Sequence, residues 1–117
     1  MRFAEIGLAV VLCASFMLLG IAKVSGLPAS LAVRDHLGVG PSLWTVIGVL
    51  EVLGAFGVVV GAFAAPELGV VAAGGLAALS VGAVVSHLRR HDTVAAVAPP
   101  VVLGVLAMTE TVLLLTG

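Results

Sequence analysis

The stretch PSLWTVIGVLEVLGAFGVVVGAF, residues 41–63, consists mostly of apolar residues and carries one ionisable residue, Glu51. A helix needs about 20 predominantly apolar residues to cross the roughly 30 Å of hydrocarbon in a bilayer. The stretch meets that length, and it lacks the alternation of apolar and polar residues that a membrane β-strand requires. It therefore predicts a membrane-spanning helix.

Three other stretches of the chain have a similar length and the same apolar character. Together the four predict an all-α fold, an integral membrane four-helix bundle with a short interfacial helix between helices one and two. A single membrane domain is expected over residues 1–117, with spans at about 3–24, 41–63, 66–88 and 94–116 and the interfacial segment at about 27–38. That segment mixes leucines with charged residues, which suits a helix lying at the membrane surface.

The composition of the chain excludes several classes of protein. Hydrophobic residues make up 62% of the 117 residues and charged residues only 9%. A soluble domain carries about 25% charged residues, and a disordered chain has low hydrophobicity, so neither class fits. The net charge of −1 offers no basic face for nucleic acid. The single cysteine, Cys13, excludes an internal disulfide. The expected partner of the whole chain is the lipid bilayer.

Basic residues predict the orientation in the membrane. The connections after the first and third spans hold Lys23, Arg34, Arg89 and Arg90, whereas the opposite side holds Arg2. Cytoplasmic connections carry an excess of lysine and arginine. We therefore expect a multi-pass protein of the cell membrane with both termini outside.

Glu51 is the most informative residue. It lies about ten residues into its helix, roughly 15 Å along the axis and near the bilayer centre. An ionised carboxylate at that depth costs several kcal/mol, so Glu51 holds a proton or has a partner. The functional interpretation is a proton carrier, an acid/base group or a ligand anchor. The structural one is a neutral carboxyl that hydrogen-bonds to a neighbouring helix. We favour the functional one, because intramembrane ionisable residues mark functional sites.

Lys23 and His87 are the other candidates for catalysis or for binding a cofactor. Lys23 ends the first span, where its amine either snorkels to the interface or reaches inward toward Glu51. His87 lies near the end of the third span and either relays protons or belongs to the polar helix end. His87 and His91 have the spacing of two metal ligands, but no third ligand is evident, so no metal site is expected.

Two further acidic residues, Glu5 and Glu110, fall toward the predicted outer side. They form an outer polar patch if the fold brings them together. For Glu110, which is flanked by Thr109 and Thr111, a hydrogen-bonded structural role is equally open.

Small residues indicate where helices pack. Gly57 and Gly61 form one row in the second span, and Gly74, Ala78 and Gly82 form another in the third. Such rows let helix backbones approach closely in a membrane. We expect these two helices to pack together along them.

The pair Pro99-Pro100 leaves two interpretations of the last span. If the helix begins near Val94, the carbonyls of Ala95 and Ala96 lose their donors. If it begins at Pro99, the prolines occupy an ordinary helix start. We favour the second.

Three short motifs carry a resemblance to a known family. They are Gly20-Ile21-Ala22-Lys23 followed by Gly26 and Pro28, then Ile47-Gly48-Val49-Leu50-Glu51-Val52-Leu53-Gly54, and finally Gly82-Ala83 with His87. In order and spacing the sequence resembles the DoxX-like family of small four-helix membrane proteins over nearly the whole chain. The resemblance implies a four-helix bundle with Lys23, Glu51 and His87 around a central cavity. It links the chain to quinone-coupled oxidation of sulfur compounds, to redox-stress complexes or to the assembly of other membrane proteins.

The favoured function is a small subunit, or a quinone- or lipophile-binding component, of a membrane redox system. Glu51, Lys23 and His87 would bind a quinone head group and move protons, while a redox partner protein supplies electrons and the chain itself carries no cofactor. One alternative is a stand-alone enzyme that uses Glu51 as acid or base on a lipophilic small molecule. Another is an accessory or assembly protein of a membrane complex. A proton-coupled multidrug transporter ranks last, because the glutamate of those proteins lies in the first helix.

Overall fold

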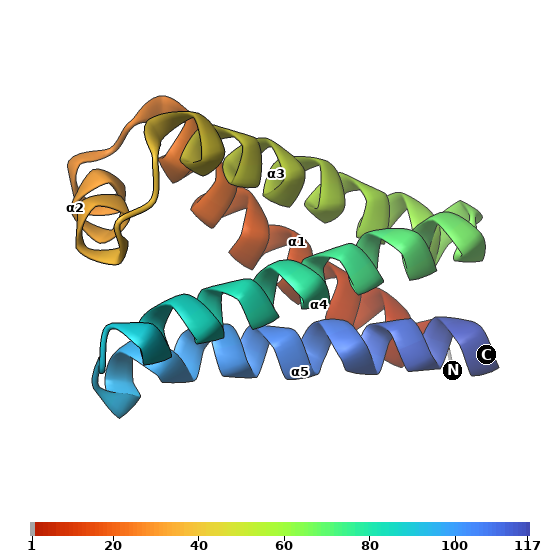
Figure 1. Ribbon diagram of the computed structural model, residues 1–117. Coiled ribbons are helices and arrows are strands. Elements are labelled where there is room, and N and C mark those ends of the chain that lie inside the picture. The colour runs from red at the N-terminus through yellow and green to blue at the C-terminus, as the bar shows by residue number, and fades with distance from the viewer. Residues whose placement is uncertain (1) are drawn as a thin grey trace.

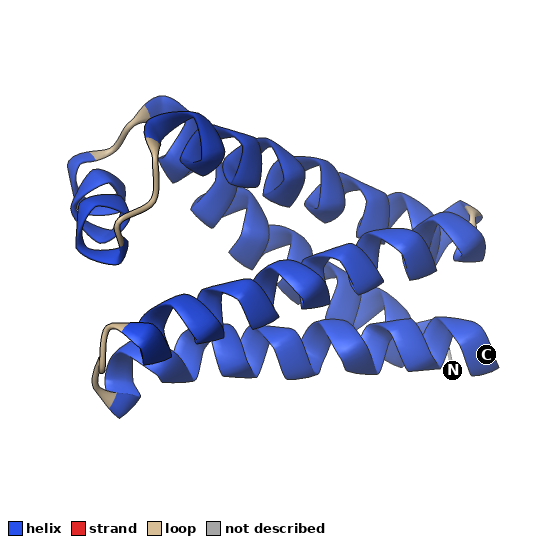
Figure 2. Ribbon diagram, in the orientation of Figure 1, coloured by secondary structure: helices blue, strands red, loops and turns tan. Residues whose placement is uncertain are grey.

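Residues 2–117, the part of the chain that the computed structural model describes, form five α-helices and no strand (Figure 2). The helices are α1 (Arg2–Ser25), α2 (Pro28–Leu37), α3 (Pro41–Ala64), α4 (Pro66–Arg89) and α5 (Val94–Thr116). The predicted all-α fold is confirmed, and α2 is the short helix expected between the first two spans.

Four of these helices are long and apolar enough to cross a membrane. The helices α1, α3, α4 and α5 have 23 or 24 residues each and a mean hydropathy between 1.8 and 2.3 over their best windows. At most a third of the residues in those windows are buried within the protein. Large apolar side chains are exposed along all four helices. A surface of this kind needs lipid around it, and the protein is a multi-pass membrane protein.

The long helices pack as a series of antiparallel pairs. Helix α1 packs against α3, α3 against α4, and α4 against α5. Figure 1 shows both termini at one end of the bundle and α2 at the other, beside the region where α3 and α4 diverge. The longest extent of the molecule is 40 Å, close to the thickness of a bilayer with its headgroup regions.

The ends of the helices follow from proline and cap residues. Pro28, Pro41 and Pro66 each occupy the first turn of a helix, where the missing N–H costs nothing. Helix α5 begins at Val94, because the hydroxyl of Thr93 accepts a hydrogen bond from Ala96 N at 3.3 Å. Our preference for a start at Pro99 is therefore wrong. The cap lies one and a half turns earlier, and both prolines stand inside the helix.

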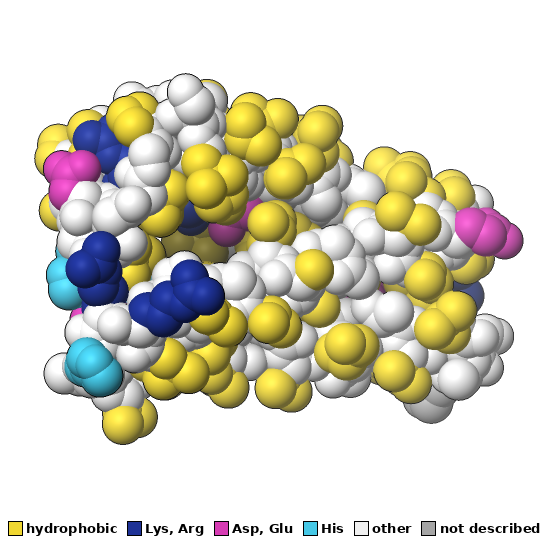
Figure 3. Space-filling view, in the orientation of Figure 1, with side chains coloured by type: hydrophobic (Ala, Val, Ile, Leu, Met, Phe, Trp, Pro, Cys, Tyr) yellow, Lys and Arg dark blue, Asp and Glu magenta, His cyan; other side chains and the backbone are white. Residues whose placement is uncertain are grey.

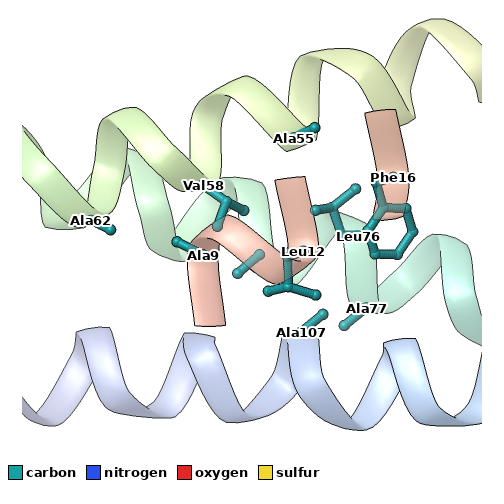
Figure 4. Packing of buried hydrophobic residues seen from close by; sticks show 10 residues of the cluster. Ala9, Leu12, Phe16, Ala55, Val58, Ala62, Leu76, Ala77 and Ala107 are labelled. Atoms are coloured by element: carbon teal, nitrogen blue, oxygen red, sulfur yellow. The ribbon is translucent and has the colours of Figure 1, made fainter. Parts of the chain in front are cut away.

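The core of the bundle lies midway along the helices. Leu12 and Phe16 of α1 meet Val58 of α3 and Leu76 of α4 there (Figure 4). The other members of this buried cluster are alanines, namely Ala9, Ala55, Ala62, Ala73, Ala77 and Ala107. Small side chains let the helices approach closely, so van der Waals packing can hold a bundle in lipid.

Glycines of α3 face α4 as predicted, but the row predicted on α4 is wrong. Gly61 contacts the backbone of Gly69, and a Cβ on Gly57 would lie 2.8 Å from that of Ala72. Gly74 and Gly82 have open space around them. The packed stripe of α4 instead contains Gly69, Ala73, Leu76, Ala77 and Ser80, which are all buried. Ala73 and Ala77 of this stripe come one residue before Gly74 and Ala78 of the predicted row. One residue corresponds to a rotation of roughly 100° about the helix axis.

A second close approach joins α1 to α3. A Cβ on Gly48 would lie 2.7 Å from Lys23 Cβ and 2.9 Å from the carbonyl oxygen of Gly20. A Cβ on Gly20 would lie equally near the carbonyl oxygen of Gly48, at 2.7 Å. Neither position has room for a side chain, so the two backbones are in direct contact there.

We predict that Gly48→Ala destabilises the bundle and that Gly74→Ala does not. The added methyl of Gly48→Ala must displace α1, and overpacking of this kind costs about 1–3 kcal/mol. Gly74→Ala adds the same methyl to a helix of similar length but in open space, so its effect is neutral or mildly stabilising. Thermal unfolding of both variants in detergent measures the difference. Equal melting temperatures would contradict the close α1–α3 contact.

Candidate ligand-binding site

Lys23 and Glu51 form an ion pair between α1 and α3. Lys23 Nζ lies 2.8 Å from Glu51 Oε1, and the two side chains are only 12% and 6% exposed. The pair follows from the glycine contact, since each charged residue comes three positions after one of the touching glycines, Gly20 and Gly48. Successive positions of this spacing lie on one face of a helix. The backbone contact therefore brings the two charges together.

Trp44 completes the wall of the site. Its ring lies beneath the Lys23 ammonium, with 4.8 Å between Nζ and the ring centroid, which is a cation–π arrangement. Trp44, Gly48 and Glu51 lie on one face of α3 and are all buried. The indole N–H of Trp44 donates to Ser30 Oγ of α2 at 3.0 Å. The same residue thus touches the ion pair and holds α2.

Glu51 keeps unused hydrogen-bonding capacity. Its Oε1 lies 2.8 Å from Lys23 Nζ and has no other partner among residues 2–117, although a carboxylate oxygen can accept two hydrogen bonds. A ligand hydroxyl could donate to the second lone pair of this oxygen.

The protein surface is hollowed near this end of the bundle. Figure 3 shows a depression between α3 and α4, beside α2, with hydrophobic atoms at its base and both basic and acidic atoms at its edge. On the outer side of the α1–α3 pair lies a separate apolar groove of about 300 Å³. It is lined by Ile21, Val24, Ser25, Val49, Val52 and Leu53, which include the sequence neighbours of Lys23 and Glu51.

His87 takes part in a second cluster, at the rim of this end. The carboxylate of Asp92 accepts from His87 Nδ1 through Oδ2 and from His36 Nε2 through Oδ1, both at 2.6 Å. Arg90 Nη2 also donates to the carbonyl oxygen of Leu37 at 3.4 Å. These contacts fasten the end of α2 to the α4–α5 connection. The ion-pair partner of His87 is therefore Asp92, and not Glu51.

The environment of Asp92 changes its protonation. Hydrogen bonds from His87 first and from His36 second hold the pKa of the Asp92 carboxyl below its ordinary value of 3.8. Each bond favours the charged carboxylate over the neutral acid. Burial acts in the opposite direction and is the smaller effect.

Sequence reasoning identified some of these residues and missed others. Lys23 and Glu51 were paired as one of two alternatives for Lys23. The sequence-based predictions use Arg34 only for orientation and do not involve His36 or Asp92. The i, i+5 spacing of His87 and Asp92 across a helix end is a local signal for their contact. No local signal points to His36, which is 56 positions from Asp92.

Other predicted features lie outside the site. Glu5 and Glu110 are buried toward the opposite end, where the termini lie. No group of three or more metal-ligating side chains occurs within residues 2–117. Neither feature contributes to the surroundings of Lys23 and Glu51.

Fold and site together define a small, helical, multi-pass membrane protein with a buried lysine–glutamate pair near one end. The family model of the DoxX-like family matches residues 7–109, which include Lys23, Glu51 and His87. The chain belongs to the DoxX-like family, and the resemblance seen in its motifs is confirmed. No curated protein and no solved structure matches it.

We predict that acid releases α2 in the wild type and that Asp92→Asn releases it at neutral pH. Because the pKa of Asp92 is lowered in the folded state, its stabilisation is present above the ordinary value of 3.8 and is lost as the pH falls through the lowered one. Trp44, the single tryptophan, bonds to α2 and reports its position by fluorescence. An acid transition in Trp44 emission is expected in the wild type and not in Asp92→Asn.

Asp35→Asn is the matched control for this experiment. Asp35 is an exposed aspartate on α2 that pairs with its neighbour Arg34 and has no bond to the α4–α5 connection. This variant should keep the wild-type transition. An identical transition in Asp92→Asn would show that the Asp92 bridge does not hold α2.

Proposed function

We propose that this protein binds the polar head of a lipophilic small molecule, a quinone in the first place, at the Lys23–Glu51 pair. It would act as a small membrane component of a redox system. The observation that carries the proposal is the buried ion pair itself, placed beside an aromatic ring near the hollowed end of the bundle. Ionisable residues inside a membrane are rare, and by default they indicate a functional site.

The residues fit the chemistry of a quinone head group. The Lys23 ammonium has three N–H donors, so it can donate to a carbonyl oxygen of the ligand as well as to Glu51. Glu51 Oε1, which has Lys23 as its partner, can also accept from a hydroxyl, the group that the reduced form presents. A bound quinone supplies two-electron chemistry coupled to protons, while this chain supplies the orientation and a proton at Glu51. The hydrophobic base of the hollow between α3 and α4 suits the apolar tail of such a ligand.

Proton supply would come through the rim cluster. His87, Asp92 and His36 are bonded in a chain at the same end as the ion pair, and His36 is half exposed to solvent. Histidine exchanges protons near neutral pH, which suits a relay between water and a buried carboxylate. In this proposal His87 is a positioning and relay residue rather than a ligand to the head group.

A redox role also requires a partner protein that delivers or removes electrons. The broad apolar surface of the four spans offers faces on which another membrane subunit can pack. An enzyme that acts alone would instead use Glu51 as acid or base, with Lys23 stabilising the developing charge. Turnover of a lipophilic substrate by the purified chain without any electron donor would favour that alternative.

The orientation that we propose places the α2 end in the cytoplasm. The basic residues Lys23, Arg34, Arg89 and Arg90 lie in the last turn of α1, in α2 and at the C-terminal end of α4, which share that end, whereas Arg2 begins α1 at the other. The excess of positive charge marks the cytoplasmic side. The Lys23–Glu51 site would then take its protons from the cytoplasm.

We predict that quinone binding depends on both members of the ion pair. A short-chain quinone added to the protein in detergent should quench Trp44 fluorescence, because the ring borders the pair. Glu51→Gln and Lys23→Met should each raise Kd about tenfold or more, since a hydrogen bond to a charged group contributes about 1.5–3 kcal/mol. Native mass spectrometry of gently purified protein would identify a retained ligand.

Glu67→Gln is the control, because it removes an exposed carboxylate at the opposite end of the bundle. It should leave Kd unchanged. Melting temperatures of all variants without ligand separate a binding defect from unfolding. Folded Glu51→Gln and Lys23→Met proteins with a wild-type Kd would refute the proposed site.

The orientation is tested with a reporter fused to the C-terminus. Alkaline phosphatase folds in an oxidising compartment, so its fusion after Gly117 should be active, and a fusion in the α4–α5 connection should be inactive. The reverse pattern would place the rim cluster and the ion pair on the outer side.

A further inference from the structure

Helices α3 and α4 separate progressively toward the end of the bundle that carries α2 (Figure 1). Near their short connection the backbones of Gly61 and Gly69 touch. About two turns closer to α2, a Cβ on Gly54 would instead meet the end of the Leu76 side chain, at 2.6 Å. A leucine side chain therefore fills a space that is absent at the glycine contact, and the two helices form a wedge that widens toward α2.

The walls of the wedge continue beyond Gly54 and Leu76. Ile47 of α3 and Ala83 of α4 each lie seven residues further toward α2, a spacing that keeps them on the same helix faces. Both side chains are half-buried. Ala83 offers only a methyl group toward the widening gap. Figure 3 shows the result, a depression between α3 and α4 with hydrophobic atoms at its base.

The Lys23–Glu51 pair adjoins this wedge. On α3, Glu51 lies four residues after Ile47 and three before Gly54, so the three residues share one face. The outer side of the pair is closed, because the backbones of α1 and α3 touch at Gly20 and Gly48. Neither charged residue lines the apolar groove outside that contact. The pair is thus reached from the side of the wedge and not from the outer groove.

Helix α2 bridges the wide end of the wedge. Near its start the hydroxyl of Ser30 accepts a hydrogen bond from the indole of Trp44, on α3, at 3.0 Å. At its end the carbonyl oxygen of Leu37 accepts one from Arg90, the cap residue of α4, at 3.4 Å. Because α2 is bonded to both walls, it closes the wedge at the membrane surface and leaves the side between α3 and α4 facing the lipid.

Entry from water beneath α2 is unfavourable for an apolar ligand. That route would break the hydrogen bonds of Ser30 and Leu37, and also the bond between His36 and Asp92. It would carry the tail of the ligand past these polar groups and through water, at a cost in free energy that grows with the apolar area exposed. The route between α3 and α4 keeps the tail in lipid.

We propose that the ligand of the Lys23–Glu51 pair enters sideways from the membrane, between α3 and α4, while α2 stays closed. This inference rests on the ligand-binding function proposed above. It narrows the ligand to an amphiphile with a compact, uncharged polar head and an apolar tail that remains among the lipid chains. Ala83 is then a specificity-determining residue, because its small side chain sets the width of the opening.

The test measures how fast decylubiquinone reaches the site in full-length protein in phosphatidylcholine vesicles, by stopped-flow quenching of Trp44 fluorescence. All proteins carry Cys13→Ala, so that only introduced cysteines react. Ala83→Phe should slow quenching about tenfold or more, because its ring fills the wedge and entry then requires a conformational change. Ala78→Phe is the matched control, since Ala78 is an exposed alanine of the same helix. It should keep the unmodified rate.

A covalent lock on α2 tests the competing route. Leu37→Cys and Arg90→Cys are combined and joined by a short bis-maleimide, which replaces the hydrogen bond between these residues. Locking should leave the quenching rate within about twofold of the same protein before reaction, because α2 stays closed during sideways entry. Loss of quenching on locking, with an unmodified rate in Ala83→Phe, would overturn the proposal in favour of entry from water. Unmodified rates in both would also overturn it.

Two further measurements separate a defect in entry from unfolding and from loss of the binding site. If Ala83→Phe lowers the melting temperature, Ala83→Cys is folded first and then modified with N-benzylmaleimide, which adds a ring at the same place. Entry and exit share one route, so a narrowed wedge should slow both and leave Kd nearly unchanged. A raised Kd at an unmodified rate would overturn the role of Ala83. Absent quenching in the unmodified protein would instead refute the proposed binding function, and this route with it.

Discussion

The contact between α1 and α3 at Gly20 and Gly48 is the constraint on which the candidate site depends. In lipid the hydrophobic effect does not drive helices together, so the approach of two backbones must come from packing and polar contacts. In this protein the glycine packing and the polar contact lie three positions apart on each helix. The glycines remove every side chain that would keep the helices apart, and the charged residues three positions later attract one another at 2.8 Å. The glycine contact brings the two charged side chains within reach of each other, and their attraction in turn holds the two backbones together.

Helix α2 depends on a different kind of interaction. It has no buried residue, so packing contributes little to its position. Polar contacts hold it at both ends, through Ser30 and Trp44 near its start and through His36 and Asp92 near its end. Trp44 also faces Lys23, which couples the position of α2 to the ion pair. The indole ring of Trp44 is therefore in contact with both α2 and the buried ion pair.

The sequence predicted the helices and the depth of Glu51 because both depend on local composition. Hydropathy over about 20 residues determines which segments span, and position within a span determines depth. The packed face of α4 was predicted wrongly because all sides of a membrane helix are apolar, so periodicity does not distinguish lipid from neighbour. Gly74 and Gly82 form as regular a row as the buried stripe around Ala73, yet they face open space.

Within the site, a contact between consecutive spans could be predicted from the sequence, whereas a contact between distant segments could not. Lys23 ends one span and Glu51 sits inside the next, so antiparallel packing of neighbouring helices can bring them together. The bridge from His36 through Asp92 to His87 requires α2 to fold back onto the α4–α5 connection. That fold is decided by the three-dimensional path of the chain around Gly38, which takes a left-handed conformation with φ of 71°. Glycine permits this turn, but the sequence alone does not give its direction.

The buried glutamates Glu51 and Glu110 differ in their surroundings. Glu51 is already compensated by Lys23, so its site has little net charge and presents a donor and an acceptor side by side. Such a site suits a neutral molecule with polar oxygens. Glu110 is buried toward the opposite end, and neither of its carboxyl oxygens has a hydrogen-bond partner among residues 2–117. The core around Leu12 lies between Glu51 and Glu110, so the Lys23 ammonium compensates Glu51 alone.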